Sequence, residues 1–249
     1  MNKRTIGLIL LVLMGGALVY LNRTYAHIYD KITTVNLNEP TYKQVYILGD
    51  KSQINPRLYV ALGDSLTSGV GADRYEHSYP YLVAENLTEK WGAVVLEHQS
   101  FPGARSSDIV GAPLEKTIAA QPKLVTILIG TNDIHGNVMP LLFSHNYEQI
   151  LSRLTQETSA RVYAISIPYI GDRSLLLWPY NWYFNWRIRQ FNGIIKNLAA
   201  RYNIQYIDLY TPTLKTFEQG GSHYAADHFH PSALGYALWA PIIYDYLNH

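Results

Sequence analysis

Three residue types that cooperate in nucleophilic catalysis occur in suitable settings in this chain. Ser65 lies in the segment Gly63-Asp64-Ser65-Leu66, and Asp227 precedes His230 by three residues near the C-terminus. A neutral imidazole can accept the proton of a serine hydroxyl, while a carboxylate about one turn away fixes the imidazole tautomer. Taken singly, Ser65 is more simply a helix N-cap, and Pro231 after His230 suits the first turn of a helix. Together the three residues predict nucleophilic chemistry at serine.

Two further positions could stabilise negative charge that develops during such a reaction. Asn132 lies in Gly130-Thr131-Asn132-Asp133, and its side-chain amide is an uncharged donor suited to an oxyanion. Gly103, in Phe101-Pro102-Gly103-Ala104, allows a backbone N–H to approach a ligand closely. The simpler interpretations are an Asx turn at Asn132 and an ordinary turn at Gly103.

A histidine-rich stretch near the C-terminus permits a competing interpretation as a metal site. It contains His223, Asp227, His228 and His230, but their spacing matches no common zinc pattern. The chain has no cysteine, which excludes disulfides, thiolate zinc sites, iron–sulfur clusters and a cysteine nucleophile. We therefore expect no metal and no organic cofactor.

The elements that must position these residues alternate between strand and helix. Five runs rich in aliphatic and β-branched residues predict buried strands: Leu58–Leu62, Ala93–Glu97, Leu124–Ile129, Arg161–Ile167 and Gln205–Leu209. Amphipathic stretches between and after them predict helices: Tyr79–Lys90, Tyr147–Thr158, Arg187–Tyr202 and Ser232–Leu247. Val45–Leu48 predicts a short additional strand. This alternation predicts a parallel sheet with helices on both faces, and ligands then bind beyond the carboxyl ends of the strands.

The N-terminus differs from the rest of the chain. Lys3 and Arg4 precede an almost wholly apolar run, Ile6–Leu21, which as a helix would span about 24 Å. The run is longer than a usual signal-peptide core and lacks a clear cleavage site, so we interpret it as an uncleaved signal anchor. The basic residues before the run place the N-terminus in the cytoplasm and the remainder outside. The alternative is a cleaved signal that releases a secreted protein.

Composition limits the classes of function. The 249 residues carry a formal net charge of +1, which argues against nucleic-acid binding by a basic surface. Hydrophobic residues make up 48% and charged residues 16% of the chain, which excludes a disordered chain. We expect a segment 1–26 that anchors the protein, a linker 27–56 and a globular domain 57–249.

The order of the motifs resembles the GDSL/SGNH hydrolase family of esterases and acylhydrolases. Four blocks occur in family order: Gly63-Asp64-Ser65, Gly103, Gly130-x-Asn132-Asp133 and Asp227-x-x-His230. The resemblance covers the chain from Leu58 to the C-terminus. It implies a three-layer α/β/α sandwich with five parallel strands in the order 2-1-3-4-5, preceded here by the N-terminal transmembrane helix.

The resemblance also implies roles for individual residues. Ser65 matches the nucleophile and one backbone donor of the oxyanion hole, Gly103 the second backbone donor, and Asn132 the side-chain donor. His230 matches the general base and Asp227 the carboxylate that orients it. The pair Phe101-Pro102 before Gly103 departs from the small residues usual in that block. Asp64 and Asp133 are expected to hold their loops through hydrogen bonds.

The substrate is predicted only as a class of ester. An exported, anchored domain meets cell-envelope glycans and lipids, and we favour an O-acyl carbohydrate or another small ester. A lipase or lysophospholipase of the same family is the alternative, and a catalytically inactive surface-binding relative is a further one. The segment Leu175–Trp186 contains six aromatic rings, and Trp178 and Trp182 are its candidate substrate contacts. Core packing or a membrane interface are the other interpretations of these rings.

Overall fold

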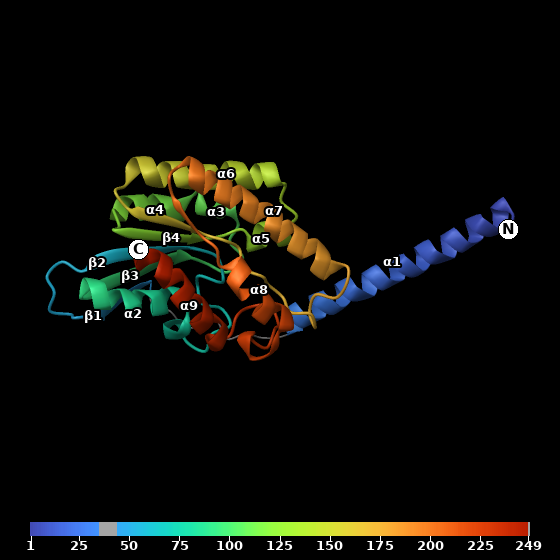
Figure 1. The fold of residues 1–249 in the computed structure, drawn as a ribbon, viewed down its shortest axis with the longest axis horizontal. Helices are drawn as coiled ribbons and strands as arrows, with labels where there is room; N and C mark the ends of the chain where they lie inside the picture. The colour runs from blue at the N-terminus through green and yellow to red at the C-terminus, as the bar shows by residue number, and fades with distance from the viewer. Residues whose placement is uncertain (35–43, 249) are drawn as a thin grey trace.

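A computed structural model describes residues 1–34 and 44–248 (Figure 1). A long N-terminal helix, α1 (Lys3–Thr34), projects from a layered domain that contains the rest of the described chain. The middle of the expected linker, residues 35–43, lies outside the described residues.

The centre of the domain is a sheet in which five strands run parallel. They are β2 (Arg57–Gly63), β3 (Ala93–Ser100), β4 (Leu124–Leu128), β5 (Arg161–Ile165) and β6 (Gln205–Ile207). Their order, β3-β2-β4-β5-β6, is the 2-1-3-4-5 arrangement. All five residues of β4 are buried, as expected for a strand covered on both faces. The predicted fold class is confirmed.

A sixth strand extends this sheet at one edge. β1 (Val45–Gly49) pairs antiparallel with β3, Val45 opposite Glu97 and Gly49 opposite Ala93. Among the described residues the sheet therefore consists of the five expected parallel strands and the short additional strand expected at Val45–Leu48. Exposed residues alternate with more buried ones along β1, as expected for an edge strand.

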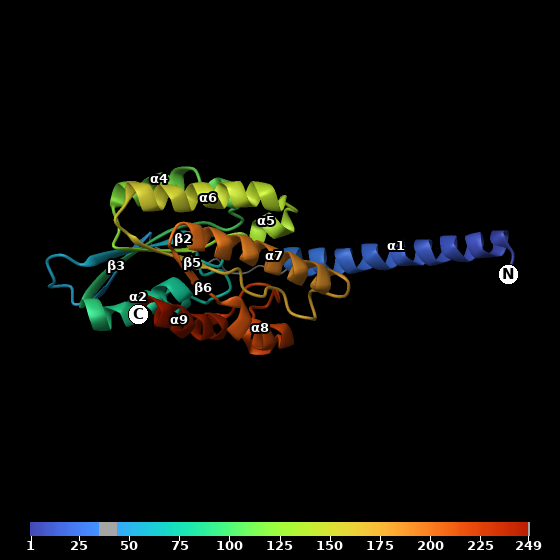
Figure 2. The ribbon, with the colours of Figure 1, turned by 45° about the horizontal axis from the view of Figure 1, so that its top comes forward.

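Helices cover both faces of the sheet (Figures 1 and 2). One layer contains α2 (Tyr79–Trp91), α8 (Tyr210–Gln219) and α9 (Ala233–Asn248). The other contains α3 (Ser106–Ile109), α4 (Ala112–Ala120), α5 (Thr131–His135), α6 (Pro140–Glu157) and α7 (Tyr180–Arg201). Two short 3-10 turns, Tyr75–His77 and Gly221–His223, complete the described elements. The helices α3, α4, α5 and α8 were absent from the sequence prediction.

Helix α7 begins earlier than predicted. It starts at Tyr180, seven residues before the predicted start at Arg187, and Pro179 occupies its N-cap position. Proline is tolerated at this end because the first turn needs no intrahelical donor. The residues before the helix divide between core and surface: Leu175 and Leu176 are buried, whereas Trp178 is exposed.

Helix α1 is long and apolar enough to cross a membrane. Its most apolar stretch has a mean hydropathy of 2.1 and is not buried by the domain. The helix continues to Thr34, past the expected boundary at residue 26. Near its carboxyl end it packs on the domain: Thr24 is buried, Ile28 touches the core, and the His27 imidazole hydrogen-bonds the Ser174 carbonyl oxygen at 2.8 Å.

Candidate active site

The residues singled out from the sequence lie at the carboxyl ends of the parallel strands. Ser65 follows β2, Gly103 follows β3, and Asn132 lies in α5 just after β4. Asp227 and His230 precede α9, whose amino end lies at the same edge. Parallel strands bring their carboxyl ends to one edge, so residues distant in sequence become neighbours there.

Ser65, His230 and Asp227 form a continuous hydrogen-bonded relay. The Ser65 Oγ lies 2.9 Å from His230 Nε2, and His230 Nδ1 lies 2.6 Å from Asp227 Oδ2. Ser65 and Asp227 are buried, and the His230 side chain is only partly exposed. The imidazole thus presents one nitrogen to the hydroxyl and the other to the carboxylate, which is the arrangement a serine nucleophile needs.

The chain around Asp227 keeps it ionised and oriented. Burial acts to raise the pKa of Asp227, but the hydrogen bond and charge interaction with His230 and two backbone N–H donors outweigh it and lower the pKa. These donors, from Phe229 and His230, both reach Oδ1 at 3.0 Å. Because Oδ1 is occupied by the backbone, Oδ2 is the oxygen that faces the imidazole.

Gly71 lies beside His230 and lets the loop that carries His230 approach the turn that carries Ser65. Gly71 has φ +94°, and a Cβ there would lie 2.4 Å from the Pro231 carbonyl oxygen and 2.9 Å from His230 Cβ. A larger residue would therefore displace His230 or strain the backbone. A bridge between Tyr224 and Pro231 ties the other side of the same loop.

The turn that carries Ser65 is organised by Asp64. The carboxylate Oδ1 of Asp64 accepts the Leu66 N–H at 3.0 Å, and its carbonyl oxygen accepts the N–H groups of Thr67 and Ser68. The Ser65 N–H has no acceptor among the described residues. Burial, with a smaller contribution from the nearby Asp133, raises the pKa of Asp64 to about 7. The expected loop-holding role of Asp64 agrees with these contacts.

Two of the expected oxyanion donors lie on neighbouring segments, the Asn132 amide in α5 and the Gly103 N–H in the loop after β3. The Asn132 amide donates to the Ala104 carbonyl at 2.9 Å, so one of its two N–H groups holds the Gly103 loop. Gly103 is exposed, has φ +81° and would have open space around a Cβ. Its N–H has no acceptor within the described part of the chain.

A buried polar cluster, of which only Asp133 was predicted from the sequence, fixes the segment after Gly103 against α5. Asp133 accepts the Ser106 N–H at 2.8 Å and the Ser106 hydroxyl at 2.6 Å. The Asn146 amide donates to the same hydroxyl at 3.1 Å. The role expected for Asp133 therefore includes Ser106 and Asn146. Asn146 lies one residue before the predicted helix Tyr147–Thr158, so no pattern in the sequence singled it out, whereas in the structure it lies on the buried face of α6.

Aromatic rings connect the start of α7 to the relay. The Phe184 ring lies 4.6 Å from the His135 ring, which lies 5.1 Å from Phe229, the neighbour of His230. Phe184, His135, Ile134 and Ile188 also line a small apolar hollow beside α5. Trp178 and Trp182 are exposed farther along this side. Their expected role as substrate contacts stays a prediction.

The histidines near the C-terminus separate into different pairs. His228 Nδ1 lies 2.9 Å from Asp172 Oδ2, whereas His230 pairs with Asp227. Within residues 1–34 and 44–248, no three His, Asp, Glu or Cys side chains are grouped as metal ligands. The competing metal interpretation thus gains no support from the geometry.

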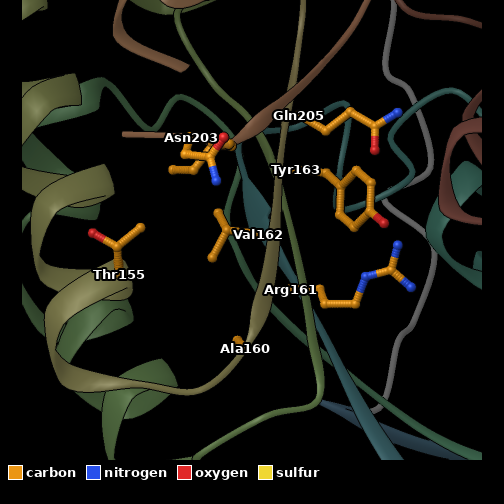
Figure 3. Close-up of a pocket in the computed structure, with 8 residues that line it drawn as sticks. Thr155, Ala160, Arg161, Val162, Tyr163, Asn203 and Gln205 are labelled. Carbon is orange, nitrogen blue, oxygen red and sulfur yellow. The ribbon is translucent and has the colours of Figure 1, made fainter. Parts of the chain in front are cut away.

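A larger hollow lies at the opposite end of the sheet (Figure 3). It is lined by Arg161 and Tyr163 at the start of β5, by Gln205 at the start of β6, and by Thr155 of α6. These are the amino ends of the strands, away from Ser65. Parallel α/β sheets bind ligands at the other edge, so we assign no chemistry to this hollow.

Similar solved structures share the fold. A lipase/acylhydrolase from Enterococcus faecalis has 23% identity and a TM-score of 0.60, covering 77% of this chain and 95% of its own. The acetylxylan esterase Axe2 from Geobacillus stearothermophilus has 19% identity and a TM-score of 0.63, and the match covers 78% of this chain and 94% of Axe2. The structure of TesA has 19% identity and a TM-score of 0.63, and the match covers 77% of this chain and 98% of TesA. A comparison with curated protein sequences found no match.

The family assignment comes from the sequence profile of a known family. The profile of the GDSL-like Lipase/Acylhydrolase family matches residues 61–238, which include every residue of the relay and both expected oxyanion loops. The fold and the match agree with the resemblance drawn from the four sequence blocks. The chain therefore belongs to the GDSL-like lipase/acylhydrolase family and is a hydrolase that acts on ester bonds.

Proposed function

We propose that this protein hydrolyses carboxylic esters through a Ser65–His230–Asp227 triad. The observation that carries the proposal is the continuous relay from Ser65 Oγ through both His230 nitrogens to Asp227 Oδ2, at 2.9 and 2.6 Å. Its burial favours the chemistry because the ion pair that forms between His230 and Asp227 is stronger away from water.

The reaction has two steps that use the same groups. Ser65 Oγ bonds to the ester carbonyl carbon while His230 Nε2 takes the hydroxyl proton, and His230 then returns that proton to the departing alcohol oxygen. Water next attacks the acyl-serine, again giving its proton to His230. The acyl–serine bond breaks, the carboxylic acid leaves, and Ser65 recovers its proton.

The oxyanion would be held by three donors from separate loops. These are the N–H groups of Ser65 and Gly103 and the second N–H of the Asn132 amide. The support for this assignment is that both backbone donors lack an internal acceptor within the described residues, and that Asn132 is fixed by Ala104. Donors fixed before the reaction need little reorganisation as charge develops.

We further propose that α1 anchors the catalytic domain outside the cytoplasmic membrane. The exposed apolar helix and the basic residues before it support this topology. A reporter fused after His249 should report an extracytoplasmic position, and the purified protein should retain its N-terminus. A mature form starting at His27 would replace the anchor with a cleaved signal, and a cytoplasmic reporter would contradict the orientation.

For the substrate, we propose an O-acylated carbohydrate of the cell envelope or another small ester. One protein with the same fold is an acetylxylan esterase, which supports this choice over long-chain lipids. Lipase or lysophospholipase activity is the second candidate, and the exposed Trp178 and Trp182 favour it.

A panel of esters tests both candidates. Hydrolysis should be measured on chromogenic esters from acetyl to long acyl chains, on acetylated glycans and on lysophospholipids, with Ser65→Ala as the control. Preference for acetyl groups supports the first candidate, and preference for long chains supports the second. A chain that hydrolyses none of them would be an inactive binding relative.

A further inference from the structure

Six large apolar side chains are exposed together at the amino ends of α6 and α7. They form what we call the exposed apolar patch: Met139, Leu141, Leu142, Trp178, Trp182 and Trp186. Trp178 is 67%, Trp182 62% and Leu141 81% exposed. Clustered exposure of this kind marks an interaction surface, whereas single exposed apolar residues are common on any protein.

Hydrogen bonds hold the two halves of the patch side by side. The Tyr183 hydroxyl donates to Asn137 Oδ1 at 3.0 Å, and Arg187 Nη2 donates to the Val138 carbonyl at 2.5 Å. These bonds tie the second turn of α7 to the residues just before α6. The patch is therefore a defined surface formed by two helix ends, and it includes three of the five tryptophans of the chain.

Helix α1 meets the domain directly beside this patch. The Tyr20 hydroxyl donates to the Trp178 carbonyl at 2.8 Å, and the two rings lie 6.4 Å apart. The Tyr180 hydroxyl approaches the Leu21 carbonyl at 3.4 Å. Figures 1 and 2 show the amino end of α7 on the side of the domain from which α1 projects.

The contact point coincides with the end of the apolar run. Ile6–Leu21 is the membrane-length stretch, and Asn22 and Arg23 follow it. In a spanning helix, Tyr20 and Leu21 would thus lie at the boundary between hydrocarbon and head groups. Trp and Tyr concentrate at this depth because one part of each ring system is apolar and another part is polar. The bonds from Tyr20 and Tyr180 hold Trp178 at the same depth.

We propose that the exposed apolar patch inserts shallowly into the outer surface of the bilayer that α1 crosses. The proposal rests on the proposed anchor role of α1 and adds a second membrane contact, which would fix the orientation of the domain. A series of ring contacts connects Phe184 of α7 to His230: Phe184 packs against His135, His135 against Phe229, and Phe229 against His230. The docked side of the domain would therefore adjoin the serine site, and an ester at the lipid surface would reach Ser65 over a short path.

Quenching of tryptophan fluorescence tests the docking. The full-length chain is reconstituted in vesicles of phosphatidylcholine and phosphatidylglycerol, with or without bromine atoms on the acyl chains. Bromine quenches only nearby indoles, so the wild-type protein should lose much of its emission in brominated vesicles. The double variant Trp182→Phe/Trp186→Phe should lose a clearly smaller fraction. The matched control Trp91→Phe removes a tryptophan elsewhere on the domain, so its quenched fraction should be at least as large as that of the wild type.

The outcomes separate this proposal from its rivals. If the double variant is quenched as much as wild type, only Trp178 beside the anchor meets lipid, and the docking is refuted. If Trp182 and Trp186 are quenched by aqueous acrylamide and not by brominated lipid, they face water and the docking is also refuted. Shielding from both quenchers would indicate a second copy of the chain on the patch and would likewise refute the docking. Hydrolysis of a soluble acetate ester by the same vesicles reports the serine chemistry independently of the quenching.

Discussion

Replacing Asp227 by asparagine should remove activity while leaving the fold unchanged. The backbone N–H groups of Phe229 and His230 both donate to Oδ1 at 3.0 Å, so the amide oxygen of asparagine would take that position. The amide nitrogen would then replace Oδ2 and point an N–H at His230 Nδ1, now 2.6 Å from the carboxylate. His230 Nδ1 must become the acceptor, and the ring proton moves to Nε2.

That tautomer cannot act as a base toward Ser65. The proton on Nε2 would face Ser65 Oγ, where the mechanism needs a lone pair. Tautomer loss of this kind costs about 10⁴-fold in kcat, or roughly 5.5 kcal/mol of transition-state stabilisation at about 1.36 kcal/mol per decade. The assay is hydrolysis of a chromogenic acetate ester at neutral pH, with circular dichroism to confirm the fold.

A second aspartate–histidine pair in the same region provides the matched control. Asp172 Oδ2 lies 2.9 Å from His228 Nδ1, but His228 does not contact Ser65. Asp172→Asn makes the same chemical change outside the relay and should keep kcat within a few-fold of wild type. The proposed role of Asp227 is refuted if Asp227→Asn retains a tenth or more of the activity, or if Asp172→Asn loses as much as Asp227→Asn.

Four other substitutions follow from the site. Ser65→Ala and His230→Ala should each lower kcat by about 10⁶-fold, and the double variant should lose little more because the two act as a unit; additive losses would contradict this. Asn132→Ala should lower kcat by about 10²–10³-fold with little change in KM, whereas a raised KM alone would make Asn132 a substrate ligand. Burial raises the pKa of Asp64 from 3.8 to about 7, so the folded chain keeps a proton that the unfolded chain releases. Wild-type stability should therefore fall from pH ~4 to ~7, by on the order of 4 kcal/mol, relative to Asp64→Asn; parallel denaturant-unfolding profiles would refute the assignment.

Much of the candidate site could be predicted from the sequence because most of its polar residues directly follow predicted strands. Asp227 and His230 are three residues apart, so their contact is local and could be inferred directly. The contact between Ser65 and His230 crosses 165 residues and depends on the sheet order. That order came from the family resemblance, because alternating strands and helices alone do not fix which strands are neighbours.

Features that depend on tertiary contacts were missed. β1 was predicted as a strand, but its antiparallel pairing with β3 depends on a partner about fifty residues away. The bonds from Ser106 to Asp133, and from Asn146 to Ser106, join three separate segments. α7 begins seven residues early because its first turns pack beside α1 and α5, which local propensity does not encode.

Covalent labelling of Ser65 is a direct test of the proposed Ser65–His230–Asp227 triad. A fluorophosphonate reacts with a serine only where a neighbouring base activates the hydroxyl, so it reports the relay without any assumption about the substrate. We expect one adduct per chain, mapped to Ser65 by peptide mass spectrometry, with loss of ester hydrolysis in proportion to labelling. Ser65→Ala should not label. An adduct on another residue, or full hydrolysis by a chain that cannot be labelled, would contradict the role of Ser65 as the nucleophile.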